Sequence, residues 1–290
     1  MTGPAAPAGS ALGASPVATA FGKAAADNRA ALVGYLPAGF PTVAGAIDAA
    51  KAMAAAGADV IELGLPYSDP VIDGPVIAEA VHQALLKGTR VADVLRTVEA
   101  IAAAGVAVLV MTYWNPIDHY GVRAFARDLA AAGGSGLITP DLSPEEAGPW
   151  LQASDEYGLD RVFLAAPSSV DQRLATVTKS CRGFVYAASL MGITGTREAV
   201  SGQAAGLVER VRKHTDLPVA VGLGVSNGAQ AAQVAEFADG VIVGSAFVRR
   251  LLEAATPADA VRAITTLTTE LAAGVRRPGA PAQPPPSQPE

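Results

Sequence analysis

The chain has 290 residues, half of them apolar, and carries a formal net charge of -6. This length and composition indicate a globular protein with a sizeable core, built as one large domain or two modest ones. The negative charge argues against nucleic-acid and anionic-membrane partners, because surfaces that bind them need clustered Lys and Arg.

The predicted elements begin after a tail of small residues at 1–15, which we expect to be disordered. A helix is expected over 16–29. Eight short apolar runs rich in β-branched residues follow, and amphipathic Ala-rich segments such as 44–57 and 92–105 separate them as expected helices. The eight runs, each a predicted strand, are 31–36, 58–65, 106–113, 135–140, 161–166, 184–189, 218–224 and 240–246. The Pro-rich end, 277–290, is a second expected disordered tail.

Strands that are apolar on both faces and alternate with helices predict a parallel sheet covered by helices. Eight such units favour a (β/α)8 TIM barrel over an open doubly wound sheet, in which a GxGxxG motif would commonly follow the first strand. The predicted organisation is therefore one barrel domain at 16–276 between the two tails. Its N-terminal helix covers the bottom, and extra short helices follow strands two and eight.

The second predicted strand ends in the stretch ELGLPYSDPVIDGP, which begins at Glu62. Active sites of such barrels lie at the C-terminal ends of the strands, where Glu62 would point inward. One interpretation is a core carboxylate paired with a base, but no Lys or Arg lies at the end of a predicted strand. Burial without a cation would raise the pKa of Glu62 and favour a role in proton transfer.

Two further acids lie in the loop after this strand. Asp69 sits in the turn sequence Ser-Asp-Pro, which favours a structural role. Asp73 precedes Gly74 and Pro75, where we expect a helix to begin. Spacing alone leaves Asp73 open between a turn or N-cap residue and a catalytic residue.

Three glycine-bearing strand ends predict a phosphate site. GITG at 192–195 follows strand six, GLGVSNG at 222–228 follows strand seven, and VGSAFV at 243–248 follows strand eight and enters a helix at Ser245. Small residues let backbone N–H groups approach an anion, and a helix N-terminus adds a favourable dipole. Each piece alone also fits a plain turn.

Other chemistries find little support in the sequence. The single cysteine, Cys181, excludes an internal disulfide and a cysteine-built metal site, and it suits the cytoplasm. The three histidines show no metal-ligand spacing, and none of the five lysines falls where a Schiff base would form. The uncharged stretch 100–117 is broken by Gly105 and Pro116, so we expect no transmembrane helix, and the start of the chain does not read as a secretory signal.

What remains is a carboxylate-driven reaction on a small phosphorylated molecule. Apolar and aromatic residues near the same rim could cover a flat ring, although such residues more often belong to a core. They are Tyr35, Leu65, Tyr113 and Tyr186.

At this point the sequence resembles the α subunit family of tryptophan synthase. The resemblance spans roughly 18–273 and rests on ELGLPYSDPVIDGP, on LVGYLPAGFP from Leu32, on MTYWNP from Met111, on SLMGITG with the preceding Tyr186, and on the GLGVS and VGSA loops. It implies a (β/α)8 barrel that cleaves indole-3-glycerol phosphate to indole and glyceraldehyde 3-phosphate by a retro-aldol reaction.

The resemblance also implies residue roles. Glu62 would be the catalytic acid and base, and Asp73 would accept the indole N–H and stabilise positive charge on the ring. Substrate-binding positions carried over from the family are Tyr35, Tyr113, Tyr186, Thr194, Gly195, Gly224, Gly244 and Ser245. Thr194 would help to close the site, and Tyr35 stands where other members often have Phe.

The family works in an αββα complex, so the resemblance implies a β subunit as partner. The loop 66–74 and the MTYWNP region would meet that subunit, which would receive the indole. Pyridoxal phosphate would be bound only by the β subunit, and this chain would need neither a cofactor nor a metal.

Two alternatives stay open from the sequence. Another phosphate-binding barrel enzyme, an isomerase or synthase, would share the loops after strands seven and eight but lack the acids Glu62 and Asp73. A barrel retained chiefly to activate a β subunit would not need both acids.

Overall fold

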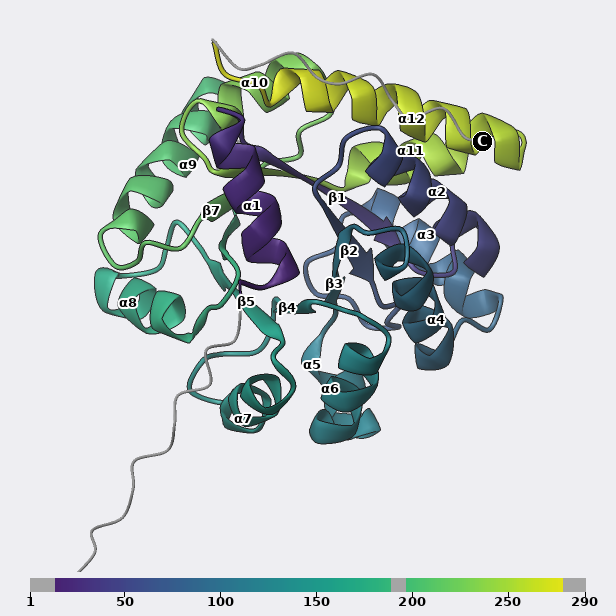
Figure 1. Ribbon diagram of the computed structural model, residues 1–290, viewed down its shortest axis with the longest axis horizontal. Helices are drawn as coiled ribbons and strands as arrows, with labels where there is room; N and C mark the ends of the chain where they lie inside the picture. The colour runs from purple at the N-terminus through teal and green to yellow at the C-terminus, as the bar shows by residue number, and fades with distance from the viewer. Residues whose placement is uncertain (1–13, 189–196, 279–290) are drawn as a thin grey trace, which may run out of the picture.

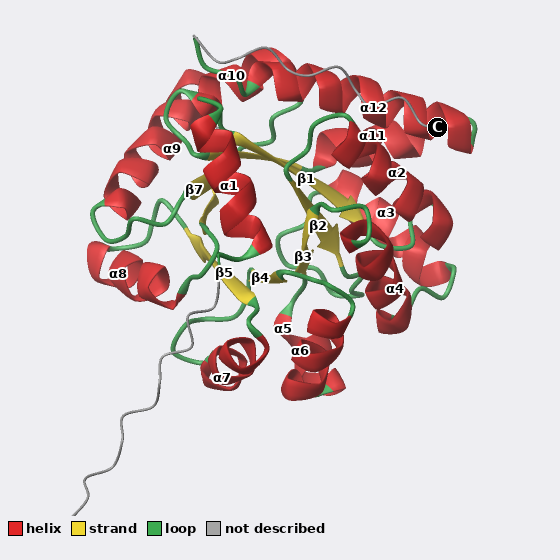
Figure 2. Ribbon diagram, viewed as in Figure 1, coloured by secondary structure: helices red, strands yellow, loops and turns green. Residues whose placement is uncertain are grey.

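The computed structural model describes residues 14–188 and 197–278 of the chain. Eight parallel strands are hydrogen-bonded in sequence order and close into a barrel, as β8 pairs with β1. Helices surround the strands on the outside (Figure 1, Figure 2). The predicted (β/α)8 barrel is therefore confirmed.

All eight predicted strands form, with ends that differ from the predicted runs by up to three residues. The largest differences are at C-terminal ends, because runs such as 240–246 include glycine-bearing loop residues that leave the sheet. The observed strands are β1 (Ala31–Pro37), β2 (Val60–Gly64), β3 (Ala107–Met111), β4 (Gly136–Thr139), β5 (Asp160–Ala165), β6 (Val185–Ala188), β7 (Val219–Gly222) and β8 (Gly240–Val243).

Twelve helices lie within the described residues. The predicted extra helices are present: β2 is followed by α3 and α4, and β8 by α11 and α12. The twelve are α1 (Pro16–Ala26), α2 (Val43–Ala55), α3 (Pro75–Leu86), α4 (Val91–Ala102), α5 (Trp114–Tyr120), α6 (Val122–Ala131), α7 (Gly148–Tyr157), α8 (Asp171–Ser180), α9 (Arg197–Arg212), α10 (Gly228–Ala235), α11 (Ser245–Glu253) and α12 (Pro257–Gly274).

Two of these helices differ from expectation. With 12 residues, α3 is longer than the short helix expected after the second strand. The seven-residue α5 was not expected, because Pro116 and the polar residues around it read as a turn. Pro116 is compatible with α5 since it lies in the first turn, where its missing N–H would have no intrahelical acceptor.

Successive side chains of a strand point to opposite faces, so every second residue enters the barrel. Val33 and Val60 belong to a buried cluster inside the barrel, together with Leu109, Ile138 and Val162. Two residues further along β1 and β2 stand Tyr35 and Glu62, which are paired in register. The apolar layers thus end, towards the C-terminal side, in a layer that carries polar side chains.

Helix α1 covers the opposite end of the barrel, as predicted, and lies across it in Figure 1. Its buried face consists of Val17, Phe21 and Ala24, which join the inner cluster. The ring of Phe21 stacks on that of Phe184 with centroids 5.2 Å apart. The helix ends three residues before the predicted boundary, and Asn28 then adopts a left-handed conformation (φ 51°) that no helix continues.

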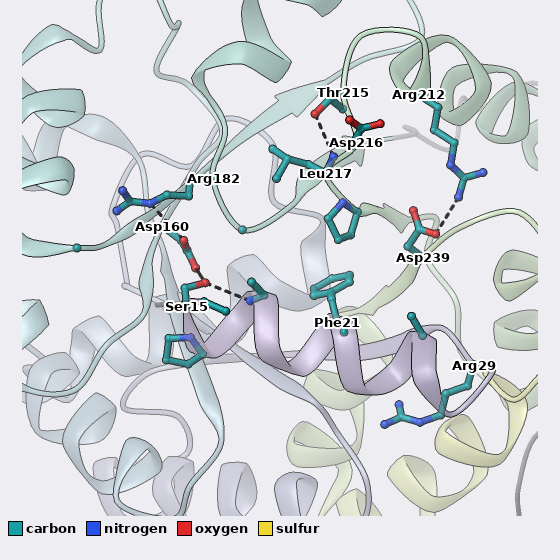
Figure 3. A pocket seen from close by; sticks show the side chains of 18 of the residues that line it. Ser15, Phe21, Arg29, Asp160, Arg182, Arg212, Thr215, Asp216, Leu217 and Asp239 are labelled. Atoms are coloured by element: carbon teal, nitrogen blue, oxygen red, sulfur yellow. Dashed lines mark hydrogen bonds and ion pairs between the residues drawn. The ribbon is translucent and has the colours of Figure 1, made fainter. Parts of the chain in front are cut away.

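A cavity of about 920 Å³ lies beside α1 at this bottom end (Figure 3). Some of the charged groups that line it pair with one another, as Arg212 does with Asp239 at 2.9 Å. The carboxylate of Asp160 is fully buried there and accepts a hydrogen bond from the Ser15 hydroxyl at 2.6 Å. The same hydroxyl accepts from the Ala18 N–H at 3.1 Å, so Ser15 caps α1 and ties it to β5.

We expect Ser15→Ala to lower the free energy of unfolding by roughly 2–4 kcal/mol. The loss of an N-cap costs about 1 kcal/mol. A buried carboxylate oxygen left without its donor costs ~1–3 kcal/mol more. Urea unfolding measures the change, with Thr42→Ala as the matched control, since Thr42 caps α2 by accepting from the Gly45 N–H and contacts no buried acid. Equal losses in the two variants would contradict a role of the Ser15–Asp160 bond.

Candidate active site

The predicted site residues that the structure describes lie at the C-terminal ends of the strands. Tyr35 and Glu62 are on β1 and β2, Asp73 is in the loop between β2 and α3, and Tyr113 follows β3. Tyr186 is on β6, Gly224 follows β7, and Gly244 and Ser245 join β8 to α11. Thr194 and Gly195 lie outside the described residues.

Glu62 is a buried acid that forms no ion pair with any residue the structure describes. Its side chain is 1% exposed, and Oε2 has no hydrogen-bond partner among the described residues. Burial, reinforced by the negative charge of Asp73, raises the pKa of Glu62 to about 8. At neutral pH the carboxyl group is therefore mostly protonated, and it can either give up or take back a proton with little bias.

Asp73 is half-buried in the loop that leads into α3. Burial raises the pKa of its carboxyl group, while a hydrogen bond from the Tyr113 hydroxyl to Oδ1 (3.3 Å) acts in the opposite direction. The negative charge of Asp73 also contributes to the raised pKa of Glu62. Asp69, in contrast, is exposed and accepts a hydrogen bond from the Ser68 hydroxyl at 2.5 Å, as a residue that shapes a turn does.

Two tyrosine rings lie against glycines at this end of the barrel. A Cβ atom on Gly64 would come within 2.3 Å of the Tyr35 hydroxyl oxygen. A Cβ atom on Gly222 would come within 2.7 Å of that of Tyr186. Both glycines therefore leave the space that the rings occupy, since a Cβ atom at either position would overlap the ring.

Gly64 lies against the predicted site residue Tyr35 although the sequence analysis assigned it no role, and Gly222, expected as part of the loop after strand seven, also lies against Tyr186. One signal could have found both: each glycine stands at an inward position at the top of a strand, two residues beyond an inward-facing side chain. Glycine at such a position indicates the close approach of another group.

The glycine-bearing ends of β7 and β8 offer backbone groups. Gly224 has a positive φ of 66°, which glycine adopts without strain. Helix α11 begins at Ser245, and its first intrahelical bond is donated by the Phe247 N–H to the Gly244 oxygen at 2.9 Å. The N–H groups of the first turn are thus directed out of the helix, as in sites that bind anions.

Over the described ranges, no group of three or more His, Cys, Asp or Glu side chains is arranged to hold a metal ion. Cys181 is buried and burial raises the pKa of its thiol to about 12, so it stays protonated near neutrality. None of the helices in these ranges is long and apolar enough to cross a membrane.

Known proteins resemble the chain over most of its length. The family model for the tryptophan synthase alpha chain matches residues 21–276. The tryptophan synthase alpha chains of Thermobifida fusca and Salinispora arenicola are 61% and 62% identical to it, over 88% and 91% of this chain and 95% and 99% of theirs. A structure of Mycobacterium tuberculosis tryptophan synthase contains a chain with a TM-score of 0.85 and 55% identity, covering 91% of this chain and 100% of that one.

Proposed function

Since the chain belongs to the tryptophan synthase alpha chain family, lyases that cleave indole-3-glycerol phosphate, we propose that Glu62 and Asp73 are its catalytic carboxylates. The observation that carries this proposal is the buried carboxyl group of Glu62, which has a pKa of about 8 and an Oε2 atom without a partner among the described residues. Such a group is suited to transfer protons near neutral pH.

The cleavage needs one proton to be delivered and one to be removed. Protonated Glu62 gives its proton to C3 of the indole ring, which leaves a positive charge delocalised onto the ring nitrogen. The resulting carboxylate then takes the proton of the glycerol hydroxyl next to the ring. That oxygen forms the aldehyde as the carbon–carbon bond breaks, and the bond's electron pair restores the indole, so Glu62 ends protonated as it began.

Asp73 supplies the charge that this intermediate needs. In its ionised form it accepts the indole N–H and stabilises the positive ring, an interaction that is strong in a site shielded from water. The protein's own hydrogen bond to Oδ1 favours that ionised form. A carboxyl group with a pKa raised to about 8, beside a second one whose ionised form is favoured by a hydrogen bond, is the arrangement expected of an acid with an electrostatic partner.

The remaining positions bind the substrate in this proposal. Tyr35 and Tyr186 flank the ring. Gly224, after β7, and Gly244 and Ser245, at the start of α11, hold the phosphate with backbone and hydroxyl groups. Thr194 and Gly195 are proposed on the family resemblance alone.

We further propose the family's β subunit as partner, in an αββα complex that receives the indole. The side chains of Val71 and Ile72 in the β2–α3 loop are 79% and 43% exposed, which suits a surface that a partner covers. Pyridoxal phosphate would be held by the β subunit, so this chain would need no cofactor of its own. A barrel domain at 16–276 and a cytoplasmic location complete the proposal, and the reduced, buried Cys181 is compatible with the latter.

The pH dependence of kcat/KM tests the role of Glu62. The reaction starts from the protonated acid, so kcat/KM should fall about tenfold per pH unit above pH 8, as the pKa of about 8 requires. Cleavage of indole-3-glycerol phosphate by the full-length chain between pH 6 and 10 measures the profile. A flat profile from pH 7 to 9.5 would contradict the acid role. The Cys181 thiol, with a pKa of about 12, does not titrate in this range.

A further inference from the structure

The hydroxyl group of Tyr113 makes three hydrogen bonds to one loop. Its oxygen accepts the backbone N–H groups of Val71 and Ile72, both at 3.0 Å, and it donates to Oδ1 of Asp73 at 3.3 Å. A tyrosine hydroxyl has one proton to donate and two lone pairs that accept, so these three partners use its whole capacity. The substrate therefore finds no free hydrogen-bonding group on this oxygen.

Tyr113 itself is held rigidly. It follows β3 directly, its side chain is 6% exposed, and its ring lies 5.3 Å from that of Tyr67. The next residue, Trp114, donates its backbone N–H to both carboxylate oxygens of Asp141, at 2.9 and 3.0 Å. The Tyr113 side chain is thus held in place at the C-terminal end of β3 by its own packing and by the hydrogen bonds of the next residue.

The loop that Tyr113 holds faces in two directions. The N–H groups of Val71 and Ile72 point inward to the tyrosine, while their side chains are among the most exposed apolar groups of the described residues. Asp73, the next residue, is half-buried and bonded to the same tyrosine hydroxyl. The Tyr113 hydroxyl oxygen is bonded both to the Val71 and Ile72 N–H groups and to the Asp73 carboxylate. A partner that covers Val71 and Ile72 therefore contacts the residues that are linked to Asp73 through this hydroxyl.

We propose that Tyr113 is a positioning residue whose hydroxyl fixes the β2–α3 loop and keeps the Asp73 carboxylate ionised and aimed at the substrate. This inference rests on the catalytic role proposed for Asp73. In place of the substrate-binding role expected from the sequence, Tyr113 acts through Asp73, because its hydroxyl is already bonded to the Val71 and Ile72 N–H groups and to Asp73.

Asp73 is surrounded by three titratable groups, Glu62 from β2, Tyr35 from β1 and Tyr113 from the end of β3. Of these, Tyr113 is the one that lowers the pKa of Asp73 through a hydrogen bond. Removing the hydroxyl should therefore raise the pKa of Asp73 further. As the pH is lowered, activity should then begin to fall at a higher pH than in the wild type.

The test is Tyr113→Phe in the full-length chain, assayed by cleavage of indole-3-glycerol phosphate. We expect kcat to fall roughly 10- to 100-fold, the effect of one hydrogen bond to a charged group. The acid limb of kcat/KM should move to higher pH, while KM changes less than kcat. Tyr120→Phe is the matched control, because the Tyr120 hydroxyl also donates to an aspartate, Asp128, at 2.8 Å, but on an exposed part of α5. It should leave all three quantities unchanged.

A double-mutant cycle with Asp73→Asn shows whether Tyr113 acts through Asp73. The effect of Tyr113→Phe should largely disappear in the Asp73→Asn background, because the charge that the hydroxyl supports is already gone. Additive losses, or a raised KM with an unmoved acid limb, would overturn the inference and assign Tyr113 to substrate binding. Full activity of Asp73→Asn alone would instead overturn the proposed function, so the two failures are distinguishable.

Discussion

Glu62→Gln is expected to abolish cleavage of indole-3-glycerol phosphate, with a loss in kcat of at least about 10³-fold. A positioned acid or base contributes typically about 10²- to 10⁴-fold, and Glu62 is proposed to serve as both within one turnover. Glutamine has nearly the same shape but can neither give a proton to C3 nor take one from the hydroxyl. Indole release by the purified variant, measured over hours, detects any residual rate.

The fold should survive this substitution, because Glu62 Oε2 has no hydrogen-bond partner within 14–188 and 197–278 that glutamine would lose. In the wild type the pKa of Glu62 is raised from 4.5 to about 8, so the folded chain holds a proton that the unfolded chain releases. The contribution of Glu62 to the free energy of unfolding is therefore greatest below pH 4.5 and declines as the pH rises to 8. The glutamine variant lacks that decline and should gain in relative stability from pH 5 to 8. The exposed Glu99→Gln on α4 is the control and should retain activity. Wild-type turnover by Glu62→Gln would refute its role.

Asp73→Asn is expected to lower kcat by about 10²- to 10³-fold, the usual effect of losing a group that stabilises charge in the transition state. Asparagine keeps the size of the side chain, and its oxygen can still accept the Tyr113 hydroxyl. What it loses is the negative charge opposite the ring nitrogen. Steady-state kinetics should show the loss mainly in kcat, since the phosphate end of the site is unchanged.

Asp69→Asn provides the comparison within the same loop. Asp69 is exposed and bonded to Ser68, so its substitution should change cleavage by the chain less than about threefold. Equal effects at positions 69 and 73 would mean that loop shape, and not the Asp73 charge, is what the reaction needs.

The fold could be predicted because its signals are local in the chain. Runs such as 106–113 are apolar on both faces, which a buried parallel strand requires, and the helices between them show their own periodicity. Glu62 was recognisable for the same reason, since packing in an apolar core does not explain a carboxylate within such a run. Helix α5 was not predicted, because seven residues around Pro116 show too little hydrophobic periodicity to distinguish a helix from a turn.

The finer parts of the site depend on contacts that no local pattern encodes. The packing of the Tyr35 ring against Gly64 joins residues that are 29 positions apart in the chain. The hydrogen bonds from Tyr113 reach residues 40 to 42 positions away, and they exist only once β2 and β3 are paired in register. Sequence motifs identified Asp73 and Tyr113 as neighbours of the site, but the hydroxyl that joins them appears only in the fold.

The measurement that bears most directly on the whole proposal is turnover of indole-3-glycerol phosphate by the wild-type chain, with and without a β subunit. We expect indole and glyceraldehyde 3-phosphate in equal amounts from the chain alone, because Glu62 and Asp73 both belong to it. Binding of a β subunit over Val71 and Ile72 should increase that rate. No cleavage even with the β subunit present would contradict the catalytic site described for this barrel and leave it the role of an activating partner.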